Sequence, residues 1–269
     1  MHPCLLGSKP KIQLQVGRLP IPLADGVDLG GVYQRRAGEL LVRSFWQTQH
    51  MKKIYVTGEN GIEELHRLQR EFATSGLWPI LLGDDEELER IEEGLEDSSE
   101  TPNDILVSSN SIVPDEWFVA KTTEDPELYQ CEDGDWPDVD PGEIGIVTHL
   151  DLSEGKPKKR VAIALLPVRD SFETFAYLHW GGWNDCPFPQ DHCAIHRYWK
   201  ARWGSEVVSV TGDIVQCIVA NPGRDRAAAT SLAREQYLYC HDIVDQGTGT
   251  IAALAASLIN AKTWYFWWD

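Results

Sequence analysis

The stretch Trp264-Tyr265-Phe266-Trp267-Trp268, which lies next to the end of the sequence, decides the fold of the C-terminal part. Burying one large apolar side chain is worth roughly 1.5 to 3 kcal/mol, so five aromatic residues in a row must be packed. Aromatic residues are also enriched in strands. We therefore expect residues 264–268 to form a strand inside the core of the C-terminal part.

The sequence before this stretch alternates between strand and helix patterns. Val161–Leu166 is a continuous apolar run, which is typical of a strand covered on both faces. Two β-rich runs, 206–210 and 214–219, flank Thr211-Gly212-Asp213 and indicate a hairpin. Apolar residues at helical spacing predict helices over three further ranges: 188–203, 226–240 and 251–259. The pattern predicts an α/β (α+β) fold whose C-terminal lobe has a mixed sheet of about four strands covered by helices.

A strand, helix and strand precede this lobe. Residues 54–56 and 77–82 predict the two strands, and Asn60 followed by Glu63 predicts a capping box at the start of the helix between them. A charged helix is expected after this unit. We predict three parts in the chain: an N-terminal α/β lobe (1–83), an acidic, partly disordered connector (84–159) and a C-terminal α/β domain (160–269).

The negative charge is concentrated in the predicted connector. The whole chain has a net charge of −18, and 22 acidic but only two basic residues lie between Asp84 and Glu143. Nucleic acids and anionic membranes bind through Lys and Arg, so this charge argues against both as partners. A basic protein partner is expected instead, although an acidic segment can also serve solubility alone.

Cysteine usage and hydropathy indicate a cytoplasmic protein. The six cysteines are scattered, and the first residues lack the charged start and apolar run of a secretory signal. We therefore expect free thiols. No apolar run reaches the roughly 18 residues needed to span a bilayer, so no membrane association is expected.

Several motifs of the C-terminal part resemble one known family. They are Gly181-Gly182-Trp183-Asn184-Asp185-Cys186-Pro187, Ala233-Arg234-Glu235-Gln236-Tyr237-Leu238-Tyr239-Cys240, Asp242-Ile243-Val244-Asp245-Gln246-Gly247 and the final aromatic run. Together they resemble the uncharacterised bacterial family called domain of unknown function 4253, over about residues 161–269. Residues 75–83 resemble the upstream half of its longer members. The resemblance implies a bacterial, cytoplasmic protein and supplies no activity or catalytic residue.

A metal site is the first chemistry to test. Cys186, His192, Cys193 and His196 are ligand types that zinc accepts, and they fall close together in the sequence. Their spacing matches no standard zinc motif, and on one helix Cys193 points away from His192 and His196. We therefore predict no metal and no cofactor.

Nucleophilic catalysis is a second possibility. It needs a thiolate beside a base that a third group orients, and Cys186, His192 and Asp185 supply these types. No glycine-flanked nucleophile turn supports the arrangement, and a buried cysteine next to Pro187 is the simpler interpretation. We keep Asp185, Cys186 and His192 as catalytic candidates of an alternative function.

A binding surface is the third possibility. Trp180, Trp183 and Asn184 combine flat apolar area with hydrogen-bonding groups, a mixture enriched in interfaces. Asp245 and Gln246 lie in a glycine-containing turn before a helix, where main-chain N–H groups are free. The competing interpretation is that the tryptophans close one end of the core and that the turn only caps a helix.

These observations favour a non-catalytic protein-interaction module, of immunity-like or adaptor type, whose acidic surface binds a basic partner. The alternative is a small hydrolase or transferase with a Cys/His/Asp site near Trp183–Cys186 and His192. The two differ in geometry: a thiol, an imidazole and a carboxylate that converge in an open pocket favour the enzyme, and packed side chains favour binding.

Overall fold

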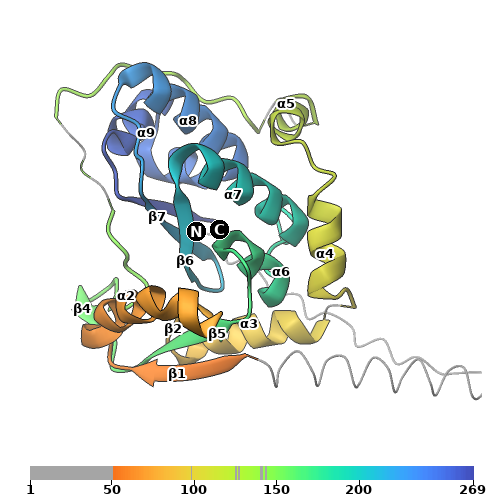
Figure 1. The fold of residues 1–269 in the computed structure, drawn as a ribbon. Coiled ribbons are helices and arrows are strands. Elements are labelled where there is room, and N and C mark those ends of the chain that lie inside the picture. Colours follow the sequence, from red (N-terminus) through yellow and green to blue (C-terminus); the bar gives the residue numbers. More distant parts are fainter. Residues whose placement is uncertain (1–50, 98, 125, 127, 140–141, 143) are drawn as a thin grey trace, which may run out of the picture. The chain divides into compact units, whose positions relative to one another are not determined.

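A six-stranded mixed sheet runs through the computed structural model, in the order β1-β5-β2-β6-β7-β8 (Figure 1). The structure describes residues 51–97, 99–124, 126, 128–139, 142 and 144–269, all within one unit of residues 40–269. The strands of this sheet are β1 (Lys52–Val56), β2 (Trp78–Gly83), β5 (Val161–Leu166), β6 (Ser205–Val210), β7 (Ile214–Val219) and β8 (Thr263–Trp267). A separate pair is formed by β3 (Leu150–Asp151) and β4 (Lys156–Pro157). The α/β class with a mixed sheet is confirmed.

The sheet has six strands rather than the four expected for the C-terminal lobe. The two additional strands are β1 and β2, which the sequence predicted in a separate N-terminal lobe. β5 pairs antiparallel with both of them, and β2 pairs parallel with β6. Every residue of β5 is buried, and a strand covered on both faces is stable only with hydrogen-bonding neighbours on both edges. The hydrogen-bonded sheet therefore crosses the boundary drawn between the two lobes. Residues 1–50 of the predicted N-terminal lobe lie outside the described residues.

The N-terminal half contains several helices, of which the first two in the chain pack beside strands of the sheet (Figure 1). They are α2 (Gly58–Ser75), α3 (Asp85–Asp97), α4 (Pro102–Ser109) and α5 (Pro114–Glu124). The capping box predicted at Asn60 and Glu63 is wrong, because α2 begins earlier with Thr57 as its N-cap and no side-chain cap. The helices α3, α4 and α5 all lie within residues 84–159, so part of the predicted connector is helical.

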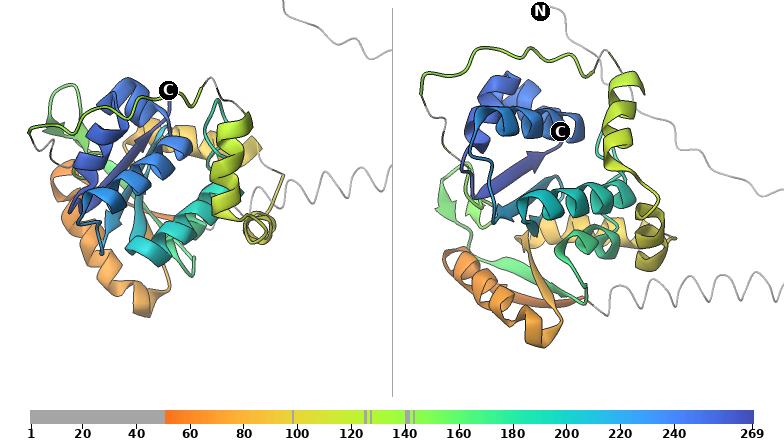
Figure 2. Two further views of the ribbon diagram at one scale, coloured as in Figure 1. Left: turned by 90° about the horizontal axis from the view of Figure 1, so that it is seen from above. Right: turned by 45° about the horizontal axis from the view of Figure 1, so that its top comes forward.

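The helices of the C-terminal half gather around β6, β7 and β8 (Figure 2). They are the short 3₁₀ turn η1 (Ser171–Glu173), α6 (Thr174–Leu178), α7 (Pro189–Trp203), α8 (Arg226–Tyr239), the π-helix η2 (Ile243–Thr248) and α9 (Ile251–Leu258). Among the helices that the structure describes, none has the length and apolar character needed to cross a bilayer.

An aromatic core joins β8 to α7 and α8. Trp264, Phe266 and Trp268 are each at most 2% exposed, whereas Tyr265 and Trp267 are half-buried, so three of the five aromatic residues lie in the core as predicted. The ring of Phe266 stacks on Trp199 of α7 at 5.6 Å and meets Tyr239 of α8 edge-on at 4.9 Å. Such ring pairs add about 0.5 to 1.5 kcal/mol beyond their buried area.

Candidate binding site

A glycine turn brings Asn184 and Asp185 to the surface. Gly181, Gly182 and Asn184 all have positive φ angles, of 117°, 90° and 46°. A Cβ on Gly181 would lie 2.2 Å from the carbonyl oxygen of Pro187, so only glycine fits at this position. The N–H of Gly182 donates to the same oxygen at 2.9 Å and closes the turn.

The π-helix η2 and the two residues directly before it supply the facing side chains. His241 and Asp245 are four residues apart, as are Asp242 and Gln246, so the members of each pair lie on one helix face. Gln246 Nε2 donates to Asp242 Oδ1 at 2.8 Å. Gly249 has a positive φ of 77°, and its N–H donates to Val244 O at 2.8 Å, which ends η2 with the wide turn of a π-helix.

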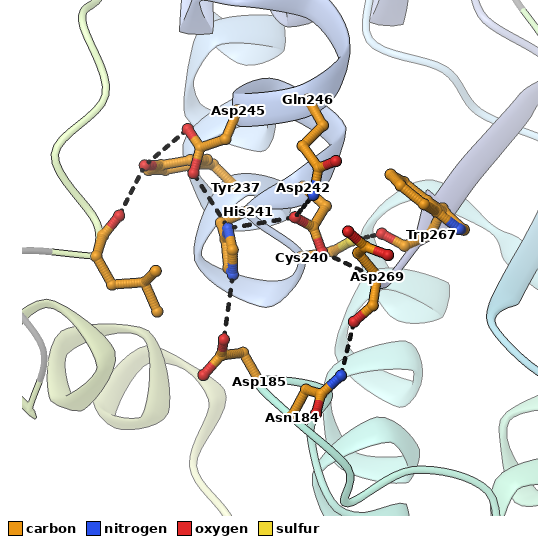
Figure 3. A network of polar contacts seen from close by, with 11 residues as sticks. Asn184, Asp185, Tyr237, Cys240, His241, Asp242, Asp245, Gln246, Trp267 and Asp269 are labelled. Carbon is orange, nitrogen blue, oxygen red and sulfur yellow. Dashed lines mark hydrogen bonds and ion pairs between the residues drawn. The ribbon is translucent and has the colours of Figure 1, made fainter. Parts of the chain in front are cut away.

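Three carboxylates surround the imidazole of His241 (Figure 3). Asp185 Oδ2 lies 3.5 Å from Nε2, while Asp245 Oδ2 and Asp242 Oδ1 lie 3.1 and 3.7 Å from Nδ1. The side chain of His241 is 13% exposed, but those of Asp185 and Asp245 are 55% and 37% exposed. We call Asp185, Asp242, Asp245 and His241 the acidic cluster. Its outer carboxylates face solvent, and its inner one is buried.

Asn184 and Asp242 also hold Asp269, which lies two residues beyond the end of β8. Asn184 Nδ2 donates to the main-chain oxygen of Asp269 at 2.7 Å, and the N–H of Asp269 donates to Asp242 Oδ2 at 3.1 Å (Figure 3). The thiol of Cys240 donates to Trp267 O at 3.0 Å. The glycine turn, the end of α8 and the end of β8 are thereby fixed against one another.

The structure brings together some of the predicted binding residues. Asn184, Asp245 and Gln246 all belong to this network, whereas Trp180 is a core residue that is 4% exposed and donates from Nε1 to Thr211 O at 2.6 Å. Trp183 is half-buried and packs edge-on against Trp180 at 4.7 Å. The tryptophans thus pack on the core side of the glycine turn, and the polar residues of this turn, Asn184 and Asp185, face the solvent.

The predicted catalytic residues do not form one site. Cys186 Sγ lies 3.4 Å from His192 Nε2, so the thiol and the base meet. Asp185 points to His241 instead, and the other ring nitrogen of His192 contacts the hydroxyl of Tyr239 at 2.6 Å. Burial raises the pKa of the Cys186 thiol, and burial followed by the nearby His196 holds the pKa of His192 well below its usual range. The pair is therefore a neutral thiol and a neutral imidazole inside the core.

The zinc-type residues are also dispersed. His196 Nε2 lies 2.8 Å from the Tyr239 hydroxyl, and its Nδ1 lies 3.7 Å from Cys217 Sγ. Within the described residues, no group of three or more His, Cys, Asp or Glu side chains is arranged to hold a metal ion. Four buried histidine and cysteine side chains form a chain of polar contacts through Tyr239, in the order Cys186, His192, Tyr239, His196 and Cys217.

The sequence interpretation missed the two residues at the centre of these networks, His241 and Tyr239. His241 could have been found from its spacing, because His241 and Asp245, like Asp242 and Gln246, are four residues apart and therefore share a helix face. Tyr239 carried no comparable signal, since its partners lie 43 and 47 positions away in the sequence.

Comparison with known proteins bears on the C-terminal part alone. No curated protein and no solved structure matched the chain. Residues 162–269 do match the model of a family described as a domain of unknown function (DUF4253), the family that the motifs of this part resemble.

Proposed function

We propose that the C-terminal part, residues 160–269, is a non-catalytic protein-interaction module, immunity-like or adaptor in type, whose acidic cluster binds a basic group of a partner protein. The observation that carries the proposal is the convergence of Asp185, Asp242 and Asp245 on the single imidazole of His241. In the part of the chain that the structure describes, these carboxylates have no Lys or Arg as ion-pair partner. A Lys or Arg side chain of a partner would supply the missing positive charge.

The surroundings of the cluster also fit a protein partner. Asp185 lies in the same turn as half-buried Trp183, and the ring of Phe188, which is 58% exposed, packs against Gly182. Aromatic rings beside carboxylates are suited to Arg, whose guanidinium stacks on rings while it donates to acids. The net charge of −18 would attract a basic partner over a longer range.

The alternative, a small hydrolase or transferase, is supported by the contact between Cys186 and His192 alone. Cys186 is 4% exposed and His192 is fully buried, so a substrate has no access to the pair in this conformation. A nucleophilic cysteine also needs a thiolate, whereas burial raises the pKa of this thiol. The geometry therefore supports binding better than catalysis.

We also propose that the protein acts in the cytoplasm of a bacterium. The five described cysteines are free, and four of them are buried. Unpaired thiols suit a reducing compartment.

The proposal is tested by comparing binding of the full chain with binding of two double variants. In Asp185→Asn/Asp245→Asn the two exposed carboxylates of the cluster become neutral. In Glu86→Gln/Glu93→Gln the same charge is removed from exposed positions on α3. Each immobilised protein is exposed to a bacterial lysate at low salt, bound proteins are identified, and the binding of each purified candidate is then measured by calorimetry.

We expect a basic protein to bind the wild type and the α3 variant equally, and the cluster variant at least about tenfold more weakly. Binding should also weaken as salt increases, because the contact is ionic. Equal binding of candidates to the two double variants, or the absence of any saturable basic partner, would refute the proposal.

A further inference from the structure

A cavity of about 460 Å³ lies between η2, α9 and the edge strand β8. Its apolar wall includes Ile243, Leu254, Leu258 and Trp264. Cavities that hold small molecules have volumes of roughly 300 to 1,000 Å³ and mostly apolar walls. Size and lining are therefore those of a small-molecule site.

Two buried donors among the lining residues lack an acceptor. Gln236 is 1% exposed and Trp264 is 2% exposed, and both line the cavity. Within the described residues, neither Gln236 Nε2 nor Trp264 Nε1 has a hydrogen-bond partner. A buried donor without an acceptor costs about 1 to 3 kcal/mol, so an acceptor bound within reach of either atom would recover this energy.

The outer edge of β8 also carries main-chain polar groups on this wall, of which Trp267 O accepts from the Cys240 thiol. The N–H of Trp268 donates to Asp213 O and the N–H of Val219 donates to Lys262 O, so the even-numbered residues of this segment face β7. Main-chain groups alternate between the two edges of a strand. Those of Thr263, Tyr265 and Trp267 therefore face away from the sheet, and these three residues line the cavity.

From these observations we propose that the cavity binds a small, uncharged, largely apolar molecule with a carbonyl-type hydrogen-bond acceptor. The unpaired donors require an acceptor, and the apolar wall requires an apolar body. An anion is disfavoured because Asp242 also lines the cavity and the chain carries a net charge of −18. The proposal does not rest on partner binding at the acidic cluster, although Asp242 belongs to both sites.

The neutral fluorophore Prodan, a naphthyl ketone, tests the proposal with the full chain. Its emission shifts to shorter wavelength in an apolar site, and titration should give saturable binding to one site. Ser257 lines the cavity, and its hydroxyl donates only to Leu254 O within α9. In Ser257→Phe the new ring fills the cavity, and saturable binding should be lost.

A second variant tests the hydrogen bond itself. Gln236→Leu keeps the shape of the side chain and removes the donor, so Prodan should bind about fivefold more weakly. A dimethylaminonaphthalene that lacks the ketone should bind this variant and the wild type equally. Gln69→Leu is the matched control, because Gln69 Nε2 is likewise buried without a partner but lies on α2, away from the cavity.

The outcomes separate clearly. Loss of binding in Ser257→Phe together with ketone-specific weakening in Gln236→Leu supports the site. The proposal is overturned by the absence of saturable binding, by undiminished binding to Ser257→Phe, or by equal weakening of both fluorophores in Gln236→Leu. Circular dichroism of each variant excludes loss of the fold as the cause.

Discussion

At the scale of single residues, the Tyr239 hydroxyl joins two buried imidazoles of the core. Its hydroxyl contacts His192 Nδ1 at 2.6 Å and His196 Nε2 at 2.8 Å, and all three side chains are at most 1% exposed. We predict that Tyr239→Phe destabilises the protein by about 3 kcal/mol, because it leaves two buried imidazole nitrogens without a partner. The free energy of unfolding in urea measures this effect.

Tyr237→Phe is the matched control on the same helix. The Tyr237 hydroxyl makes only long contacts, 3.3 Å to Leu128 O and 3.4 Å to Asp245 Oδ1. Its loss should cost less than about 1 kcal/mol. Equal effects of the two substitutions would show that the imidazoles do not depend on Tyr239.

The buried imidazoles also predict a dependence of stability on pH. Burial lowers the pKa of His196 to about 3, and it holds the pKa of His192 well below its usual range. The unfolded chain binds protons at these residues below about pH 6.5, whereas the folded protein does not, so stability falls as pH decreases. At about pH 5 the loss for His196 is on the order of 2 kcal/mol. Equal free energies of unfolding at about pH 7.5 and about pH 5 would contradict this account.

At the scale of elements, the start of α2 is fixed by close contact with the segment around β3 and β4. A Cβ on Gly58 would lie 2.5 Å from His149 O and 2.6 Å from Lys158 N, both main-chain atoms. We predict that Gly58→Ala destabilises the protein by more than about 2 kcal/mol, because the backbones must separate. Gly94→Ala in α3 should instead stabilise by about 0.5 to 1 kcal/mol, since its Cβ would meet nothing within 4 Å. Thermal unfolding of both variants is the measurement, and effects of the same sign would refute the close approach.

At the scale of the whole molecule, the shared sheet makes the C-terminal part dependent on the strands before it. Residues 160–269 alone would leave β5 without either neighbour, β1 or β2, and would remove the bond from Trp78 Nε1 to Val207 O. We predict that this fragment does not unfold cooperatively, whereas the full chain does. Calorimetry of the two proteins checks the prediction. A sharp transition of the fragment would show that it folds as a separate domain, as the sequence division implied.

The elements of the fold were predictable to a large extent. The predicted ranges near β1, β2, β5, β6, β7, α7, α8, α9 and β8 correspond to observed elements, because apolar spacing reports which face of a helix or strand is buried. The start of α2 was not predictable, because its first residue, Gly58, is held against His149 and Lys158 of a distant segment. The candidate site was predicted in part. The sequence analysis named Asn184, Asp245 and Gln246 as binding residues and Asp185 as a catalytic candidate, but it did not name His241.

The sequence by itself determined the α/β class, the packed aromatic strand and the family match of the C-terminal part, because composition, spacing and motifs are local properties of the chain. Only the tertiary structure decided that β1 and β2 complete the sheet of that part and that Asp185 meets His241 rather than His192. Both are contacts between distant segments. Their geometry depends on how whole elements pack, which no local pattern encodes.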